Sequence, residues 1–344
     1  MTPKQDLINV LSPEWVEWIC DAIERGAPSA EIEATLRAQG DPNPAQTINA
    51  LESHPIFAWA KRRLVHRERD ARRAQLYVEL HDQLWGERDR SLPVVDALSS
   101  ADFFAHYYHS LRPVVIRGWV SEWDACTSWD PSTWIERFAG VEVEVSSGRD
   151  QVYRYDRSFA QTRATVDLGA FAQELIALTE PSNDRYLIAR NHGFKRPELA
   201  QLLDDIDERP YLDPKRRAGC TALWFGPRGT ITPLHHDTCN IMFAQVWGEK
   251  EFVLIPPHAQ DLFDQASSMY SDLDPSLDLA TSPQHPHQIT LTLRAGEALF
   301  IPIGWWHAVR AQSLSVSLAM THFIAPNQFD WYRPNAPTHS TTSS

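Results

Sequence analysis

Long apolar runs, paired cysteines and an excess of basic residues are all missing from this sequence. No run approaches the roughly 18 apolar residues that a membrane-spanning helix needs, and the start, Met-Thr-Pro-Lys-Gln-Asp, lacks the basic-then-apolar layout of a signal peptide. We therefore expect a cytoplasmic protein without a membrane partner. The few cysteines show no CxxC or other paired spacing, which speaks against disulfides and against a structural zinc site; they are Cys20, Cys126, Cys220 and Cys239.

The balance of charge also narrows the function. Lys and Arg number 32 against 45 Asp and Glu, for a formal net charge of −13. A general nucleic-acid binder needs a basic footprint, so we expect no nucleic-acid partner. An acidic chain is compatible with a basic substrate, although many soluble proteins are equally acidic. With 43% hydrophobic residues and 13 Trp in 344 residues, the chain can bury a sizeable core.

Composition and periodicity divide the chain into three parts. Residues 1–90 read as helices, with Ser12-Pro13-Glu14 as a helix start and Ser29 as the cap of a second helix. A long helix is expected over 55–84, where arginines interleave with acidic residues as on a solvated helix face. Residues 91–326 read as a β-rich catalytic domain with some helices, and residues 327–344 as a flexible tail. No internal repeat is visible.

The β-rich part contains many short strands that follow a helical start. This pattern predicts a mainly β fold with helices, in which a double-sheet jelly roll follows the helical N-terminal region. A polar, proline-containing interval over 258–288 reads as a long surface insertion, and its His285-Pro-His287 reads as a loop because proline breaks strand geometry. The expected strands lie at 112–116, 141–145, 186–189, 221–225, 251–255, 289–293, 298–301, 307–311 and 314–323.

The chain is organised around one stretch, Thr230 to Pro257, which contains His235 and Asp237. In an extended segment, residues two apart point to the same side, so an imidazole and a carboxylate are presented together. The intervening His236 points the other way and should not bind a metal. His307, at the end of another apolar strand, offers a second imidazole. Two histidines and one carboxylate are the ligand set of non-haem Fe(II) oxygenases.

With these residues in view, the chain resembles the Jumonji-C or cupin-type 2-oxoglutarate oxygenases from about Pro93 to Phe323. It is most similar to the small hydroxylase branch typified by factor inhibiting HIF. The resemblance implies a double-stranded β-helix that uses Fe(II), 2-oxoglutarate and O2. It also implies that His235, Asp237 and His307 are the catalytic metal ligands.

The resemblance further implies a set of cosubstrate contacts. Lys250, in the Gly-Glu-Lys turn after the metal motif, matches the family's lysine, and its charge would pair with the distal carboxylate. Thr232 matches a hydroxyl three residues before the first histidine. Ser317 matches a small polar residue on the final strand, where Ser315, Ala319 and Thr321 share its face.

Three further residues match the family less closely. Asn240 stands three residues after the metal aspartate, one position earlier than the family's asparagine. The family's tyrosine from an earlier strand corresponds to Tyr155 or to Tyr153. Trp224, beside the metal strand, either contacts the substrate or packs in the core.

The function implied is hydroxylation of a side chain in a protein, peptide or peptide-like substrate, with release of succinate and CO2. A small-molecule substrate stays open. N-methyl demethylation on the same scaffold is an alternative, and it would need an aromatic cage, for which Trp224 and Trp305 are available. A non-catalytic metal-binding cupin is a second alternative. A zinc hydrolase is disfavoured because no general base accompanies the ligands. If the protein forms a homodimer, the N-terminal helices are the expected contact.

Overall fold

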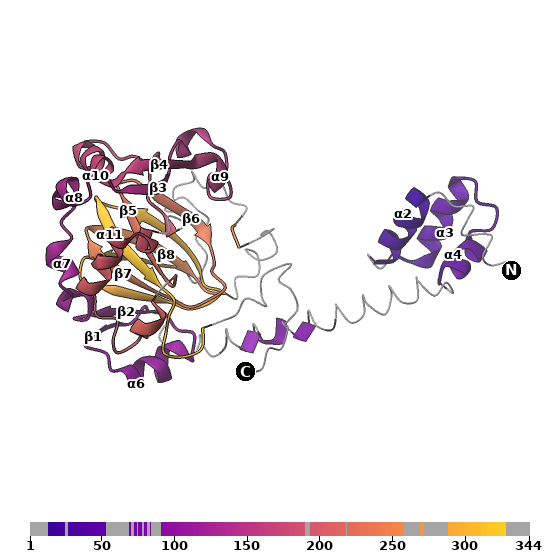
Figure 1. Ribbon diagram of the computed structural model, residues 1–344. Coiled ribbons are helices and arrows are strands. Elements are labelled where there is room, and N and C mark those ends of the chain that lie inside the picture. The colour runs from indigo at the N-terminus through magenta and orange to yellow at the C-terminus, as the bar shows by residue number, and fades with distance from the viewer. Residues whose placement is uncertain are drawn as a thin grey trace. The chain divides into compact units, whose positions relative to one another are not determined.

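The computed structural model describes residues 13–24, 27–52, 91–189, 193–217, 219–257, 269–271 and 288–327, with scattered positions between 69 and 83. The chain divides into two compact units, residues 1–87 and 88–344, which are described separately below (Figure 1). Within the described residues, no helix is long and apolar enough to cross a membrane. The predicted tail beyond residue 327, the His285-Pro-His287 loop and most of the long helix over 55–84 lie outside these ranges.

The N-terminal unit contains three short helices, α2 (Pro13–Glu24), α3 (Ser29–Ala38) and α4 (Pro44–Glu52). Their apolar positions meet in a small core of Ile19, Ala22, Ile32, Leu36 and Ile48. The α3 helix begins as expected, but its cap is Pro28 rather than Ser29, which is the first helical residue.

The second unit is built on eight strands that form two facing sheets. The large sheet has the order β10-β7-β12-β5 and the small sheet the order β6-β11-β8-β9. Successive strands alternate between the sheets except at β8–β9, which is the jelly-roll connectivity predicted from the sequence. The strands are β5 (Thr221–Gly226), β6 (Ile231–His235), β7 (Ile241–Trp247), β8 (Glu249–Ile255), β9 (Ile289–Arg294), β10 (Ala298–Ile301), β11 (Trp306–Ala311) and β12 (Ser315–Met320).

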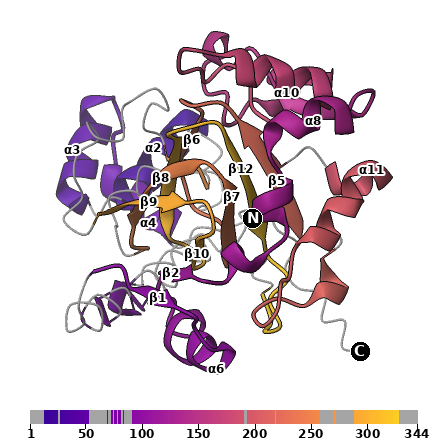
Figure 2. The ribbon, with the colours of Figure 1, turned by 90° about the vertical axis from the view of Figure 1, so that its left-hand side faces the viewer.

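Segments that precede the jelly roll widen its large sheet and cover its outer face. β1 (Val94–Asp96) and β2 (Val114–Arg117) extend the large sheet beyond β10. The helices α8 (Pro131–Arg137) and α10 (Leu168–Ala177) lie beside β5 (Figure 2), where Trp134 and Phe171 pack on Phe225. Smaller elements here are α6 (Ser100–Phe103), η1 (Phe104–Tyr108), η2 (Val120–Glu122), α7 (Ala125–Ser128), α11 (Pro197–Ala200), η5 (Gly193–Lys195), η6 (Gln201–Asp205) and η7 (Pro214–Arg216).

The open edge of the jelly roll between β5 and β6 is lined by earlier parts of the chain. Leu187 pairs with Phe225 of β5, and Tyr186 pairs with Ser146 at the end of β3 (Glu142–Ser146). β3 forms a hairpin with β4 (Arg163–Asp167), with η3 (Arg149–Gln151) and α9 (Phe159–Thr162) between them. These pairings join parts of the chain that are far apart in the sequence. They bring Tyr186 beside β6, the strand that ends in His235. Only residues 186 and 187 of the predicted strand 186–189 form such bridges.

The turn between β7 and β8 places Lys250 and depends on Gly248. This glycine has φ +72°, and a Cβ atom at this position would lie 2.1 Å from the carbonyl oxygen of Leu314. We expect Gly248→Ala to lower the free energy of unfolding by at least about 2–3 kcal/mol, from backbone strain together with this clash. Chemical denaturation measures the loss.

Gly140 provides the matched control, because it has a similar φ of +82° but nothing within 4 Å of its built Cβ. Gly140→Ala should therefore cost only the backbone strain, about 1–2 kcal/mol. Equal losses for the two variants would show that the contact with Leu314 is relaxed at no cost.

Candidate active site

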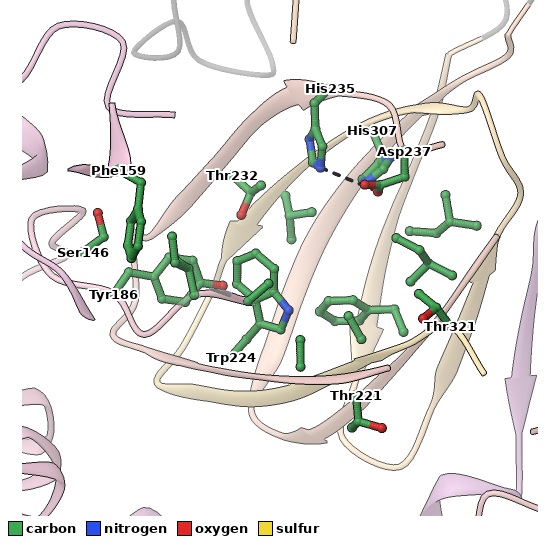
Figure 3. Close-up of a pocket in the computed structure, with 18 of the residues that line it drawn as sticks. Ser146, Phe159, Tyr186, Thr221, Trp224, Thr232, His235, Asp237, His307 and Thr321 are labelled. Atoms are coloured by element: carbon green, nitrogen blue, oxygen red, sulfur yellow. Dashed lines mark ion pairs between the residues drawn. The ribbon is translucent and has the colours of Figure 1, made fainter. Parts of the chain in front are cut away.

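Three predicted metal ligands converge at one end of the jelly roll. His235 ends β6 and pairs directly with His307 of β11, while Asp237 follows His235 by two residues. One ligand atom from each residue lies within 4.8 Å of the others. The Asp237 Oδ2 atom is 3.9 Å from His235 Nε2 and 3.3 Å from His307 Nε2. Figure 3 shows the three side chains pointing toward one another.

Backbone carbonyls set the orientation of both imidazoles. His235 Nδ1 lies 2.8 Å from the carbonyl oxygen of Pro233, and His307 Nδ1 lies 3.0 Å from that of Trp305. A proton on each Nδ1 satisfies these contacts and leaves the Nε2 lone pairs free for a metal, as in many metal-binding histidines.

The protonation states of His235 and Asp237 also suit metal binding. Burial, followed by the neighbouring His307, lowers the pKa of His235 to about 4, so its imidazole is neutral at physiological pH. Burial alone would raise the pKa of Asp237, but a hydrogen bond with His307 and the nearby histidines lower it to about 2. Two imidazoles and one carboxylate form a donor set that fits Fe(II) and leaves coordination positions open.

His236 lies on the opposite side of the strand, as predicted. Its ring is buried and packs edge-on against Trp306, with the centroids 4.7 Å apart. It does not belong to the metal-binding group found among the described residues.

A buried cation lies within the same cavity as the ligand triad. Lys250 is only 1% exposed, and its Nζ donates a hydrogen bond to the hydroxyl of Tyr186 over 3.0 Å. No carboxylate of the described chain pairs with it. Burial lowers the pKa of Lys250 to about 7. Thr232 also lines the cavity, and its hydroxyl interacts with that of Tyr186, whose own pKa is raised by burial. The cluster suits the distal carboxylate of a small dicarboxylic acid.

The depressed pKa of Lys250 predicts proton uptake when such an acid binds. Above about pH 7 the free protein holds a neutral amine, and a bound carboxylate raises the pKa by favouring the ammonium form. Affinity for 2-oxoglutarate should therefore fall as pH rises above about 7. Calorimetric titrations at about pH 8, in buffers of different ionisation enthalpy, should show up to about one proton taken up.

Lys250→Arg is the control for this prediction, because a guanidinium stays charged throughout the range. Uptake should disappear in that variant, whereas equal uptake in both proteins would assign the proton to another group.

Sequence reasoning missed Tyr186 and considered Tyr155 and Tyr153 for its place. Tyr153 is 81% exposed and does not line the cavity. Tyr155 is buried and lines it, but its hydroxyl has no hydrogen-bond partner among the described residues. The hydroxyl next to Lys250 is that of Tyr186. Trp224 lines the cavity as well, with its ring 5.5 Å from that of Tyr186.

The structure places Asn240 and Ser317 outside the cavity lining. The side-chain oxygen of Asn240 accepts a hydrogen bond from the backbone of Ile303, and Asn327 binds its backbone. Ser317 is fully buried and donates to Gln245. Because these polar groups are already engaged, we do not retain the two residues as cosubstrate contacts. Ala319 and Thr321, which share the face of Ser317, do line the cavity.

Trp305 also lies away from the cavity. It is fully buried, and its indole donates to the carbonyl oxygen of Leu111. Trp224 and Trp305 therefore do not form the aromatic cage considered from the sequence.

A short piece of the predicted surface insertion, residues 269–271, pairs with β6, the strand that ends in His235. Tyr270 forms a bridge with His235 and stacks on its ring, with the centroids 5.8 Å apart. Arg154 and Arg157 both donate to the carbonyl oxygen of Ser271, and both pair with the buried Asp156. Residues 269–271 thus cover part of the free edge of β6, which no sequence motif indicated.

The cavity has a volume of about 1130 Å³, far more than a five-carbon dicarboxylic acid needs. In Figure 3 the triad lies on one side of the cavity and Ser146, Phe159 and Tyr186 on the other, with Thr232 between them. Apolar walls come from Phe243, Phe252 and Trp224. Room therefore remains for part of a larger substrate.

The fold and the site together define a jelly-roll protein with two histidines and one carboxylate that could hold a metal ion. Residues 100–329 match the cupin-like domain family, and the chain belongs to this family. The predicted cofactors, Fe(II), 2-oxoglutarate and O2, are those of the Jumonji-C oxygenases among its relatives. The more specific assignment to the branch of factor inhibiting HIF stays a prediction.

Several relatives are similar to this chain over about two thirds of its length. The chain is 30% identical over 242 residues to lysine-specific demethylase JMJ30 of Arabidopsis thaliana, covering 64% of this chain and 52% of the relative. It is 27% identical to lysine-specific demethylase 8 of Xenopus tropicalis, covering 68% and 53%. The bifunctional peptidase and (3S)-lysyl hydroxylase JMJD7 of Homo sapiens is 24% identical, with coverage of 60% and 76%. The chain spans about half the length of the first two relatives.

Proposed function

We propose that this protein is an Fe(II)- and 2-oxoglutarate-dependent oxygenase that hydroxylates a side chain of a protein, peptide or peptide-like substrate. The observation that carries the proposal is the buried Lys250–Tyr186 pair, which lines the same cavity as the triad. A buried cation without a carboxylate partner is costly unless an anion binds beside it. A dicarboxylate that also reaches a metal at the triad meets this requirement.

Different residues of the site would bind the metal and the cosubstrate. His235 and His307 would hold iron through Nε2 and Asp237 through its carboxylate. Bound iron and 2-oxoglutarate supply the activation of O2 for oxidation of a C–H bond, with release of succinate and CO2. Lys250, Tyr186 and Thr232 would orient the cosubstrate through its distal carboxylate.

The walls of the cavity have a separate role. Trp224, Phe243 and Phe252 exclude water around the reacting groups, which strengthens the charge interactions inside.

Demethylation of an N-methyl group is the second candidate. It is favoured by the similarity of the chain to JMJ30 and lysine-specific demethylase 8, both of which are named as demethylases. JMJD7, in contrast, is named as a lysyl hydroxylase. The absence of a Trp224–Trp305 cage among the described residues removes one argument for it. A non-catalytic metal-binding cupin would leave the buried Lys250–Tyr186 pair without a purpose.

Succinate formation tests the central proposal. Purified protein supplied with Fe(II), 2-oxoglutarate and O2 should convert 2-oxoglutarate to succinate, with or without a coupled substrate. Mass spectrometry of peptides incubated with the enzyme then separates the two chemistries. Hydroxylation adds one oxygen, whereas demethylation removes a methyl group and releases formaldehyde. Complete lack of turnover in metal-loaded protein would refute the oxygenase.

Two further expectations remain proposals. The N-terminal helices α2 to α4 are retained as the expected contact of a homodimer. The cytoplasm is retained as the compartment, because the four cysteines show no paired spacing in the sequence.

A further inference from the structure

A second buried cation, Arg149, lines the cavity. It lies in η3, directly after β3, and is 4% exposed. Its guanidinium carbon is 4.3 Å from the ring centroid of Tyr155 and 5.3 Å from that of Tyr186. Contact with two aromatic rings restricts the position of the guanidinium, as stacking of arginine on aromatic faces does in binding sites.

The hydrogen bonds of Arg149 leave much of its capacity unused. Its Nη2 donates to the carbonyl oxygen of Ile231 at the free edge of β6. Its Nε is buried and has no hydrogen-bond partner among the described residues, and the same holds for the hydroxyl of Tyr155, on whose ring the guanidinium stacks. No carboxylate of the described chain forms an ion pair with it. A buried guanidinium in this state is suited to receive an anion.

The acidic side chains in the described cavity lining already have partners or a metal-binding role. They are Asp156 and Asp237. Asp237 is a metal ligand, and Asp156 pairs with Arg154 and Arg157. The Oδ1 atom of Asp156 accepts no hydrogen bond among the described residues, but two arginines already compensate the charge of this carboxylate. The described lining therefore offers no carboxylate of uncompensated charge to the ammonium group of a lysine, although lysine appears in the names of several relatives.

We propose that the substrate of this protein presents a carboxylate to Arg149, and that the site selects acidic rather than basic groups. This inference rests on the proposed oxygenase function and specifies its substrate class. Lys250 serves the cosubstrate, and Arg149 serves the substrate. The carboxylate could come from an Asp or Glu side chain or from a peptide C-terminus, because both offer the same planar pair of oxygens to a guanidinium.

Peptide binding tests the inference with two sets of probes. The first set consists of hexapeptides with acetylated and amidated ends that carry Asp, Glu, Asn or Lys at one fixed position among randomised neutral residues. The second set consists of neutral hexapeptides with a free or an amidated C-terminus. Binding is measured on full-length protein loaded with Mn(II) and 2-oxoglutarate, which keeps the site assembled without turnover. The affinity for 2-oxoglutarate is measured in parallel.

Three variants of Arg149 and one matched control complete the design. Arg149→Gln should weaken the binding of the preferred acidic probe by roughly 10- to 100-fold and leave 2-oxoglutarate binding unchanged. Arg149→Glu should shift the preference to Lys peptides, and Arg149→Lys should keep part of the acidic preference. Arg185→Gln is the control, since Arg185 also stacks on an aromatic ring, that of Phe171, but lies outside the cavity lining. It should bind every probe as the wild type does.

The results separate this inference from the proposed function. A wild-type preference for Lys peptides, or no preference in either set, would overturn the inference even if 2-oxoglutarate is turned over. Loss of 2-oxoglutarate affinity in Arg149→Gln, as large as that in Lys250→Met, would also overturn it by assigning Arg149 to the cosubstrate. Failure of 2-oxoglutarate turnover would refute the proposed function, while the peptide preference is still measured on the metal-loaded protein. Thermal unfolding confirms that each variant is folded before binding is compared.

Discussion

Replacing His235 with alanine should abolish tight metal binding and with it the formation of succinate. The substitution leaves one imidazole and one carboxylate, and removal of even an outer-shell partner of a metal ligand typically costs 10- to 100-fold in affinity or activity. We therefore expect a loss of at least about 100-fold for a direct ligand. Metal content after dialysis and succinate production measure the two effects.

The adjacent histidine provides a stringent control. His236 is more deeply buried than His235, but it packs on Trp306 and lies outside the ligand group. His236→Ala should lower stability through lost packing while retaining the metal. Equal loss of metal in the two variants, both shown to be folded, would mean that metal binding does not depend on the predicted ligand geometry.

Replacing Lys250 with methionine should remove most of the affinity for 2-oxoglutarate while leaving metal binding intact. Breaking a buried ion pair by removal of one partner costs roughly 3–5 kcal/mol, which corresponds to a loss of about two to three orders of magnitude in affinity. Calorimetric titration of Mn(II)-loaded protein with 2-oxoglutarate measures it. Methionine retains most of the apolar side-chain volume, so the buried site should stay packed.

Tyr186→Phe gives the graded comparison for Lys250. It removes one hydroxyl from the lysine's surroundings but keeps the ring and the charge. A loss of about fivefold to tenfold is expected, in line with the net contribution of one hydrogen bond. If Lys250→Met bound 2-oxoglutarate as well as Tyr186→Phe does, the cosubstrate would lie elsewhere and the non-catalytic cupin would become the better hypothesis.

Local periodicity accounts for the parts of the site that the sequence predicted. The spacing of His235 and Asp237 in an extended strand places both on one side, and it places His236 on the other. Lys250 follows the turn at Gly248 and is buried, as the resemblance to the family implied. The jelly roll was predicted from many short strands that follow a helical start, and the structure confirms it.

Residues positioned by long-range pairing could not be read from the sequence. Tyr186 reaches Lys250 because its segment bridges β5 and the end of β3, two strands separated by about 75 residues. Tyr155 and Tyr153 follow β3 and were therefore the obvious choices. Asn240 has the residue type of a ligand contact, but its side chain instead fixes the backbone at Ile303. Such choices depend on neighbours that only the folded chain supplies.

The carbonyl oxygens of Pro233 and Trp305 make the orientation of the two imidazoles independent of the neighbouring side chains. Both orienting acceptors are main-chain atoms two positions before the histidine that they contact. Exchange of a side chain therefore leaves both acceptors in place, and only displacement of the strands themselves would turn the imidazoles. The surrounding walls can thus change to admit new molecules over generations without disturbing the chemistry at the centre.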